Sequence, residues 1–302
     1  MELGVHMPLF APAGRVPTAR DLADYAALAE RLGYAALVAS DRLLTPVGWL
    51  DGLAALTIAA AATERLRLVT SVLLPALRQP AVVAKALGTL DILSRGRVIA
   101  GVGAGVSAAD FALCAVPFAE RWQRLDTAVA TLRRLWGESP GLAEAAFLPP
   151  GLSPGGPPIW IGSWGSAAGL RRAARLGDGW IASAMSTSPV QFAAVWQAVQ
   201  ADVRATGKDP SHFPNAISSL FFYLTAEPAE AATVIRDVLA PALGRAPAAL
   251  EQTALVGPAD ICTDRILQYE EAGAQHLFLW PISDPARQIQ LFAEEVFPRV
   301  RV

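Results

Sequence analysis

The segment IWIGSWGS, residues 159–166, ends an apolar run in two glycines and two serines, a composition that suits an anion-binding turn. A helix that begins at Ser166 would offer free backbone N–H groups at its positive end, with the hydroxyl of Ser163 beside them. One interpretation is therefore a ligand phosphate held by Ser163, Gly165 and Ser166. The alternative is that Ser166 is an ordinary helix N-cap.

A second glycine-rich run, VIAGVGAG at residues 98–105, also follows the pattern of a strand that ends beside a ligand. Its spacing is GxGxG instead of GxGxxG, and it closes the fourth apolar segment of the chain instead of the first, so it does not predict a dinucleotide-binding fold. Small residues here would let a flat ring lie against the strand end. Tight packing between strands explains the glycines equally well.

Asp41 and Arg42 follow the second apolar segment, where the carboxylate could face an active-site opening or form an exposed ion pair with the arginine. No Ser/His/Asp arrangement for nucleophilic catalysis stands out. The histidines share no metal-ligand spacing and the cysteines are isolated: His6, His212, His276, Cys114 and Cys262. We therefore expect no metal and no disulfide, and a bound organic cofactor that carries the chemistry.

The composition excludes several classes of protein. Of 302 residues, 53% are hydrophobic and 17% are charged, and a net charge of -2 gives no field that would attract nucleic acid or an anionic membrane. The first ten residues lack the pattern of a signal peptide, and the apolar run 53–62 is shorter than the ~20 residues that cross a bilayer. We expect a cytoplasmic protein with neither a nucleic-acid nor a membrane partner.

Short apolar segments alternate with helical patterns along the whole chain, so these side chains must be positioned by repeated βα units. Strands are expected at 4–10, 35–40, 66–74, 98–103, 159–162, 179–183, 217–224 and 275–280. Helices are expected at 18–32, 51–62, 81–93, 118–136, 166–176, 189–206, 228–239, 258–272 and 285–297. Thr18 and Asp21 form the pattern of a capping box, and Gly33 is placed to end the first helix.

Eight such units in a chain of this length predict an α/β fold, the (β/α)8 TIM barrel. The Gly/Pro-rich segment 137–158 is interpreted as a long loop before the fifth strand, because a domain boundary there would leave two half-sheets with exposed edges. Residues 1–302 would then form one domain. In such a barrel the working residues lie at the carboxyl ends of the strands, where Trp49, Trp164 and Trp280 could also stack on a cofactor or line an apolar substrate pocket.

Four stretches carry a family resemblance that covers nearly the whole chain, at residues 54–105, 117–136, 158–180 and 256–281. The most specific parts are TLDILSRGR, residues 89–97, and GDGW, residues 177–180. The chain resembles the bacterial-luciferase-like family of flavin-dependent oxidoreductases, whose members are TIM barrels that use FMN or the deazaflavin coenzyme F420.

The resemblance implies a tricyclic ring across the barrel mouth, supported by a non-prolyl cis peptide bond that would here join Ser71 and Val72. It implies that the backbone around residues 104–106 and the turn after the fifth strand hold the ribityl chain and the phosphate. The expected cofactor contacts are Met7, Asp41, Ser71, Val72, Ala104, Gly105, Val106, Gly162, Ser163, Trp164, Gly165 and Ser166. Trp49 and Trp280 are the expected substrate-pocket residues.

Two departures from the family pattern concern proton transfer and ring placement. Many relatives have Asp-His at the end of strand two, whereas this chain has Asp41-Arg42, and many have Trp where Val106 stands. Asp41 is then the remaining candidate for a catalytic acid or base. Arg15, Arg42 and Arg78 are candidate partners for the anionic glutamyl tail of F420.

The leading hypothesis is an F420-dependent oxidoreductase that passes a hydride between C5 of the deazaflavin and a small organic substrate. One alternative is an FMN-dependent monooxygenase that receives reduced flavin from a separate reductase and activates oxygen. Another is a flavin-binding protein without catalytic activity, which the loss of the strand-two histidine would permit. A homodimer is the expected assembly.

Overall fold

The computed structural model describes residues 1–10, 16–45, 48–137, 146–163 and 165–300. Eight parallel strands of this part of the chain close into a barrel in the order β1-β2-β3-β4-β5-β6-β7-β9, with β9 hydrogen-bonded back to β1. The barrel strands are β1 (Glu2–His6), β2 (Ala36–Ala39), β3 (Arg67–Thr70), β4 (Val98–Val102), β5 (Ile159–Gly162), β6 (Gly179–Ser183), β7 (Asn215–Leu224) and β9 (His276–Pro281). The predicted (β/α)8 TIM barrel is confirmed.

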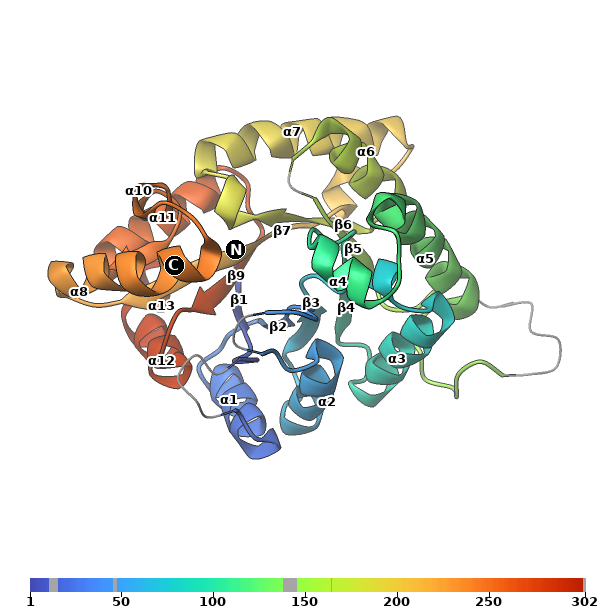
Figure 1. Cartoon of the computed structure of the whole chain (residues 1–302), viewed down its shortest axis with the longest axis horizontal. Helices are drawn as coiled ribbons and strands as arrows, with labels where there is room; N and C mark the ends of the chain where they lie inside the picture. The colour runs from blue at the N-terminus through green and yellow to red at the C-terminus, as the bar shows by residue number, and fades with distance from the viewer. Residues whose placement is uncertain (11–15, 46–47, 138–145, 164, 301–302) are drawn as a thin grey trace.

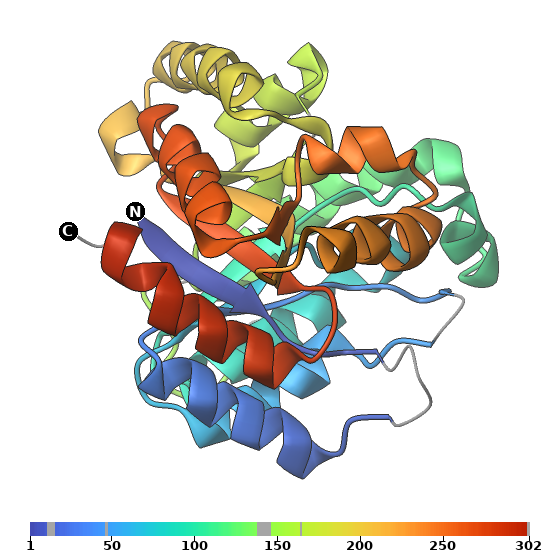
Figure 2. The ribbon, with the colours of Figure 1, turned by 90° about the vertical axis from the view of Figure 1, so that its left-hand side faces the viewer.

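A ring of helices covers the outside of the barrel (Figure 1). The ring is formed by α1 (Ala19–Arg31), α2 (Gly52–Ala62), α3 (Pro80–Leu93), α5 (Arg121–Trp136), α6 (Ala167–Leu176), α7 (Pro189–Ala205), α11 (Ala259–Glu271) and α12 (Pro285–Glu295). Helix α12 packs beside α1, which brings the last helix against the first (Figure 2). As predicted, Thr18 and Asp21 form a capping box at α1, and Gly33 follows that helix with a φ of 84°.

Both halves of the chain contribute to the closed sheet. Strand β4 pairs with β5, with Ala100 opposite Ile159, although residues 103–158 separate the two strands in the sequence. Strand β1 pairs with β9. Within the intervening segment, residues 146–158 form turns and bends, whereas residues 138–145 lie outside the described residues. That residues 1–302 form a single domain stays a prediction.

Two layers of apolar side chains hold the barrel. The larger lies between strands and helices, and the smaller fills the barrel interior. The interior cluster takes one or two inward-facing residues from each of seven strands: Ala36, Val38, Val69, Ile99, Trp160, Ile181, Ala216 and Phe278. Val72 packs on this cluster, so the barrel is a filled core whose upper surface can carry a ligand.

The sequence did not predict some short elements, because a segment of a few residues has too little hydrophobic periodicity. Strand β8 (Leu255–Gly257) pairs with the far end of β7, outside the barrel, and α4 (Ala108–Leu113) lies beyond β4. The predicted helix 228–239 is α8 (Pro228–Thr233) followed by a π-helical turn, Val234–Leu239, with α9 (Ala240–Leu243) and α10 (Pro247–Glu251) after it. Short α13 (Phe297–Val300) closes the described chain. Among the described residues, each helix is too short or too polar to cross a membrane.

Candidate functional site

A cavity of about 450 Å³ opens at the carboxyl ends of the barrel strands. This size lies within the usual range for small-molecule and cofactor sites. The site residues predicted from sequence that line it are Asp41, Ser71, Val72, Ala104, Gly105, Val106, Gly162, Ser163, Ser166 and Trp280. The structure therefore brings together residues from five strand ends that lie far apart in the sequence, from Asp41 to Trp280.

The floor of the cavity is a single layer of side chains, one from each barrel strand. Side chains alternate between the two faces of a strand, so the residue two positions after the last inward-facing apolar residue also faces inward. This rule selects Ser40, Ser71, Gly101, Gly162, Ser183, Ser218 and Trp280. In β1 the same alternation leads from Gly4 to His6, and in β4 it continues from Gly101 to Gly103. All of these except Gly4, His6 and Gly101 line the cavity directly. Apart from His6 and Trp280, these residues are no larger than serine, which leaves room for a flat ligand with polar edges.

Glycines make room for Val72 in this floor. A Cβ on Gly103 would lie 2.6 Å from Val72 Cγ2, and one on Gly162 would lie 2.7 Å from Val72 Cγ1. The peptide bond between Ser71 and Val72 is cis, as expected. Gly101 has a different role, because its Cβ would lie 2.0 Å from the carbonyl oxygen of Thr70. Packing thus accounts for Gly101, whereas Gly103 and Gly162 shape the cavity.

One end of the cavity lies at the N-terminus of α6. Ser166 is the N-cap of this helix, and its Oγ accepts a hydrogen bond of 3.2 Å from the Gly169 N–H. The Ser163 hydroxyl lies beside it, since a Cβ on Gly169 would be 2.3 Å from Ser163 Oγ and 3.0 Å from Ser166 Oγ. The N-cap interpretation is therefore correct, and two hydroxyls gather at the positive end of the helix.

Arg121 adds a cation to the cavity wall. Its guanidinium lies 4.0 Å from the ring centroid of Phe118 and donates to the Phe118 carbonyl, and it forms no ion pair with the described residues. Trp122 lines the same wall, with Arg172 of α6 stacked 4.9 Å from its ring. Sequence reasoning missed these residues because the start of α5 is far from any strand end in the sequence.

Asp41 is buried, and both of its carboxylate oxygens have partners. Oδ2 accepts a hydrogen bond of 3.0 Å from the Leu74 N–H, and Oδ1 lies 2.9 Å from Nη2 of Arg78. The same Arg78 nitrogen lies 3.0 Å from Asp51, the N-cap of α2. The arginine therefore joins the end of β2 to α2, and the predicted pair partner Arg42 is instead exposed at the cavity edge.

His6, Ser218 and Ser71 form a hydrogen-bonded chain in the floor layer. The distance from His6 Nε2 to Ser218 Oγ is 3.2 Å, and Ser71 Oγ lies 2.7 Å from Ser218 Oγ. The His6 ring stacks on Trp280 with centroids 4.1 Å apart. Burial lowers the pKa of His6 to about 3, so the imidazole is neutral near pH 7. Sequence reasoning passed over His6, because the partners come from three separate strands.

Some predicted residues lie elsewhere. Met7 is buried in the larger apolar layer and lines a different cavity, and Gly165, with a φ of 89°, is absent from the cavity wall. Trp49 stacks on Phe10 and donates from Nε1 to the Ser40 carbonyl, so it supports the wall from behind. The predictions for Trp164 and Arg15 lie outside the described residues.

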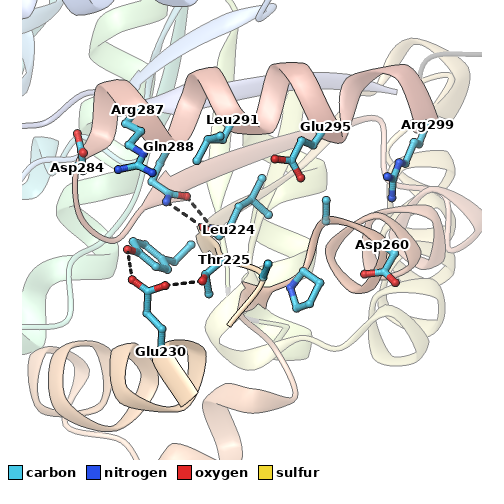
Figure 3. Close-up of a pocket in the computed structure, with 14 residues that line it drawn as sticks. Leu224, Thr225, Glu230, Asp260, Asp284, Arg287, Gln288, Leu291, Glu295 and Arg299 are labelled. Atoms are coloured by element: carbon cyan, nitrogen blue, oxygen red, sulfur yellow. Dashed lines mark hydrogen bonds between the residues drawn. The ribbon is translucent and has the colours of Figure 1, made fainter. Parts of the chain in front are cut away.

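A second cavity, of about 470 Å³, lies between the ends of β7 and β8 and helix α12 (Figure 3). Some of its polar groups are paired with one another: Gln288 bonds both the N–H and the carbonyl of Leu224, and Glu230 accepts from Tyr223 and Thr225. It lies outside the barrel and contains none of the predicted residues. In the described part of the chain, no three His, Cys, Asp or Glu side chains are grouped to hold a metal ion.

Comparison with known proteins gives one family. A family model described as luciferase-like monooxygenase matches residues 1–276. The curated F420-dependent glucose-6-phosphate dehydrogenase of Beutenbergia cavernae is 32% identical, over 93% of this chain and 94% of that protein. The dehydrogenase of the same name from Nocardia farcinica is 30% identical over the same shares of the two chains.

Solved structures share the architecture. A monooxygenase from Streptomyces bottropensis superposes with a TM-score of 0.83 at 25% identity, covering 99% of both chains. An F420-dependent secondary alcohol dehydrogenase, in complex with an F420-acetone adduct, has a TM-score of 0.82 at 20% identity, covering 100% of this chain and 99% of that one. The second likeness concerns the fold alone.

Proposed function

The chain belongs to the luciferase-like monooxygenase family, and from this premise we propose that it is an oxidoreductase that transfers a hydride between coenzyme F420 and a small organic substrate. The observation that carries the proposal is the cavity at the barrel mouth, in a chain 32% identical over 93% of its length to an F420-dependent dehydrogenase. The oxidoreductase class follows from the family, and the cofactor and substrate are the proposed parts.

The residues present fit a deazaflavin. Ser183 Oγ is buried, lines the cavity and has no hydrogen-bond partner among the described residues, so it is available to a polar edge of a ligand. Gly103 and Gly162 lower the floor on either side of Val72, which leaves a surface on which a flat ring can lie. When bound, the deazaflavin supplies the redox chemistry by accepting or donating a hydride at C5.

The chain's own residues would bind and orient the two reactants. Ser163 and Ser166 at the start of α6 would hold the phosphate, with Arg121 as a cation on the wall of the same cavity. Among the described residues, exposed Arg42 is the remaining candidate for the glutamyl tail, because Arg78 is already paired with Asp41 and Asp51. Trp280 would close the cavity on the substrate side and help to exclude water.

An FMN-dependent monooxygenase is the second candidate, which the 25% identical monooxygenase of the same fold supports. Cofactor reconstitution and turnover separate the two. The proposal predicts that the purified protein, given F420 or its reduced form and a panel of alcohols, ketones and enones, changes the deazaflavin spectrum with at least one substrate. Oxygen uptake that requires reduced FMN, with no F420 turnover, would overturn it. Binding without turnover of either cofactor would indicate the non-catalytic alternative.

A further inference from the structure

The hydrogen-bonded chain from Ser71 to His6 crosses the barrel mouth. Ser71 lies at the end of β3 and Ser218 on β7, two strands separated in the barrel by β2, β1 and β9. Their hydroxyl oxygens nevertheless lie 2.7 Å apart, and Ser218 also contacts His6 Nε2 at 3.2 Å. Ser71 and Ser218 line the main cavity, so a bound substrate can reach one end of this chain.

A local irregularity in β7 orients the Ser218 side chain toward Ser71 and His6. The register of β7 on β9 shifts between Ile217 and Leu220, and Ser219 has a φ of 61°, which is rare for a residue other than glycine. A β-bulge of this kind redirects side chains and is common beside active sites. The bulge turns both Ser218 and Ser219 toward the cavity.

His6 is fixed from three sides at the other end of the chain. Its ring stacks on Trp280, its carbonyl accepts a hydrogen bond of 3.0 Å from Tyr25, and its Nε2 faces Ser218. His6 also lines a neighbouring cavity of about 750 Å³ between α1 and the segment after β9. His6 therefore joins the floor of the cofactor cavity to the wall of a second cavity.

We propose that Ser71, Ser218 and His6 form a proton relay for the hydride-transfer reaction, with Ser71 as the group that exchanges a proton with the substrate. The relay rests on the proposed function. No histidine follows strand two in this chain, where Arg42 stands. Asp41 is less suited to the task because Leu74 and Arg78 occupy both of its oxygens.

In the oxidation of an alcohol by oxidised F420, the proton and the hydride leave the substrate for different acceptors. The substrate O–H bond breaks and its proton forms a bond to Ser71 Oγ, while the carbon-bound hydride leaves with its electron pair to the deazaflavin. The Ser71 proton passes to Ser218, the Ser218 proton passes to His6 Nε2, and the proton on His6 Nδ1 passes to a water molecule. Reduction of a ketone by the reduced cofactor runs the same transfers backward. A neutral imidazole suits this role, because it accepts a proton on one nitrogen and releases one from the other.

Imidazole NMR tests the hydrogen-bonded chain without any cofactor. In ¹⁵N-histidine-labelled protein, the proposal predicts that Ser218→Ala shifts the Nε2 resonance of His6 and leaves those of His212 and His276 unchanged. The matched control is Ser94→Ala, which removes a buried hydroxyl before the start of β4, at the opposite end of the barrel. A His6 resonance that is the same in wild type and in Ser218→Ala would overturn the relay.

Single-turnover kinetics test the proton transfer. Using the alcohol or ketone that gives the fastest turnover, we expect Ser71→Ala and Ser218→Ala to slow hydride transfer about 100-fold, a usual size for loss of general acid–base catalysis. His6→Gln should also slow it, and the Ser218→Ala and His6→Gln variants should keep the wild-type Kd for F420 within about threefold. The solvent deuterium isotope effect should change in the variants. Ser94→Ala should keep the wild-type rate and isotope effect.

The outcomes separate the two proposals. A wild-type protein that binds no F420 overturns the proposed function. The NMR experiment then tests by itself whether Ser218 is hydrogen-bonded to His6. A protein that binds F420 but oxidises no alcohol and reduces no carbonyl overturns the relay. So does a Ser218→Ala variant with the wild-type rate. A rate that falls only together with F420 affinity would indicate a structural role and would also contradict the relay.

Discussion

The serine hydroxyls at the barrel mouth are positioned by the alternation of side chains along their strands. Ser183 and Ser218 each lie two positions after an apolar residue that faces the barrel interior, Ile181 and Ala216. Counting in twos along each predicted strand would have found them, and would also have selected His6. The Ser218 contact with His6 could not be predicted, because it spans 212 residues and depends on a bulge in β7 that has no clear sequence signal.

A negative charge introduced at Ser163 tests whether this end of the site holds the phosphate. Ser163→Asp would place a carboxylate beside the N-terminus of α6, where we expect the cofactor phosphate, and like charges at close range cost several kcal/mol. We expect the Kd for F420 to rise at least about 100-fold relative to Ser163→Asn, which has the same shape without the charge. Fluorescence titration of both folded variants measures the ratio. Equal affinities would place the phosphate elsewhere.

The buried imidazole of His6 should make stability depend on pH. Burial holds its folded-state pKa at about 3, below the usual 6.5, so the unfolded chain binds a proton that the folded protein excludes. Proton binding by the unfolded chain therefore lowers the free energy of unfolding as pH falls from about 6.5 toward about 3. Between pH 6.5 and 4.5 the loss amounts to about 2 kcal/mol.

Urea unfolding of wild type and His6→Gln at these two pH values checks this prediction. The free energy of unfolding of His6→Gln should fall by about 2 kcal/mol less than that of wild type over the interval. Equal m-values in the two proteins would show that the same transition is compared. An identical decrease in both proteins would mean that His6 is not held neutral by the fold.

Among the elements, the long ones followed from sequence and the short ones did not. Strands β5 and β6 begin and end at the predicted residues, because each apolar run is bounded by a proline, a glycine or a serine. Strand β8 has three residues and pairs only with the far end of β7, so no periodicity could show it. The aromatic pairing of Trp49 with Phe10 also depends on how two loops pack.

The strand ends β3, β4 and β5 are coupled through Val72. In Gly103→Ala the new methyl group would lie 2.6 Å from Val72 Cγ2, so Val72 must move toward the ring position. We expect this variant to weaken F420 binding about tenfold, and Val72→Ala in the same protein to restore most of the affinity. Isothermal titration of the two single variants and the double variant gives the coupling. Additive effects would mean that Val72 does not support the ring.

At the scale of the whole molecule, the arithmetic of eight βα units was sufficient to predict the barrel. Closure then fixes where chemistry can occur, because parallel strands bring all their carboxyl ends to one face. The net charge of -2 says little about the cofactor, since the site concentrates its cations locally at Arg42 and Arg121. The choice between F420 and FMN depends on side chains around the mouth and could not be read from the pattern of elements.

Equilibrium binding of the two cofactors tests most directly whether this protein uses F420. Purified protein would be titrated with F420 and, separately, with FMN, and the absorption and fluorescence spectra of each cofactor followed under identical conditions. We expect saturable F420 binding at least about tenfold tighter than any FMN binding, with a rise in Tm only for F420. Tight FMN binding, with F420 spectra and Tm unchanged, would contradict it.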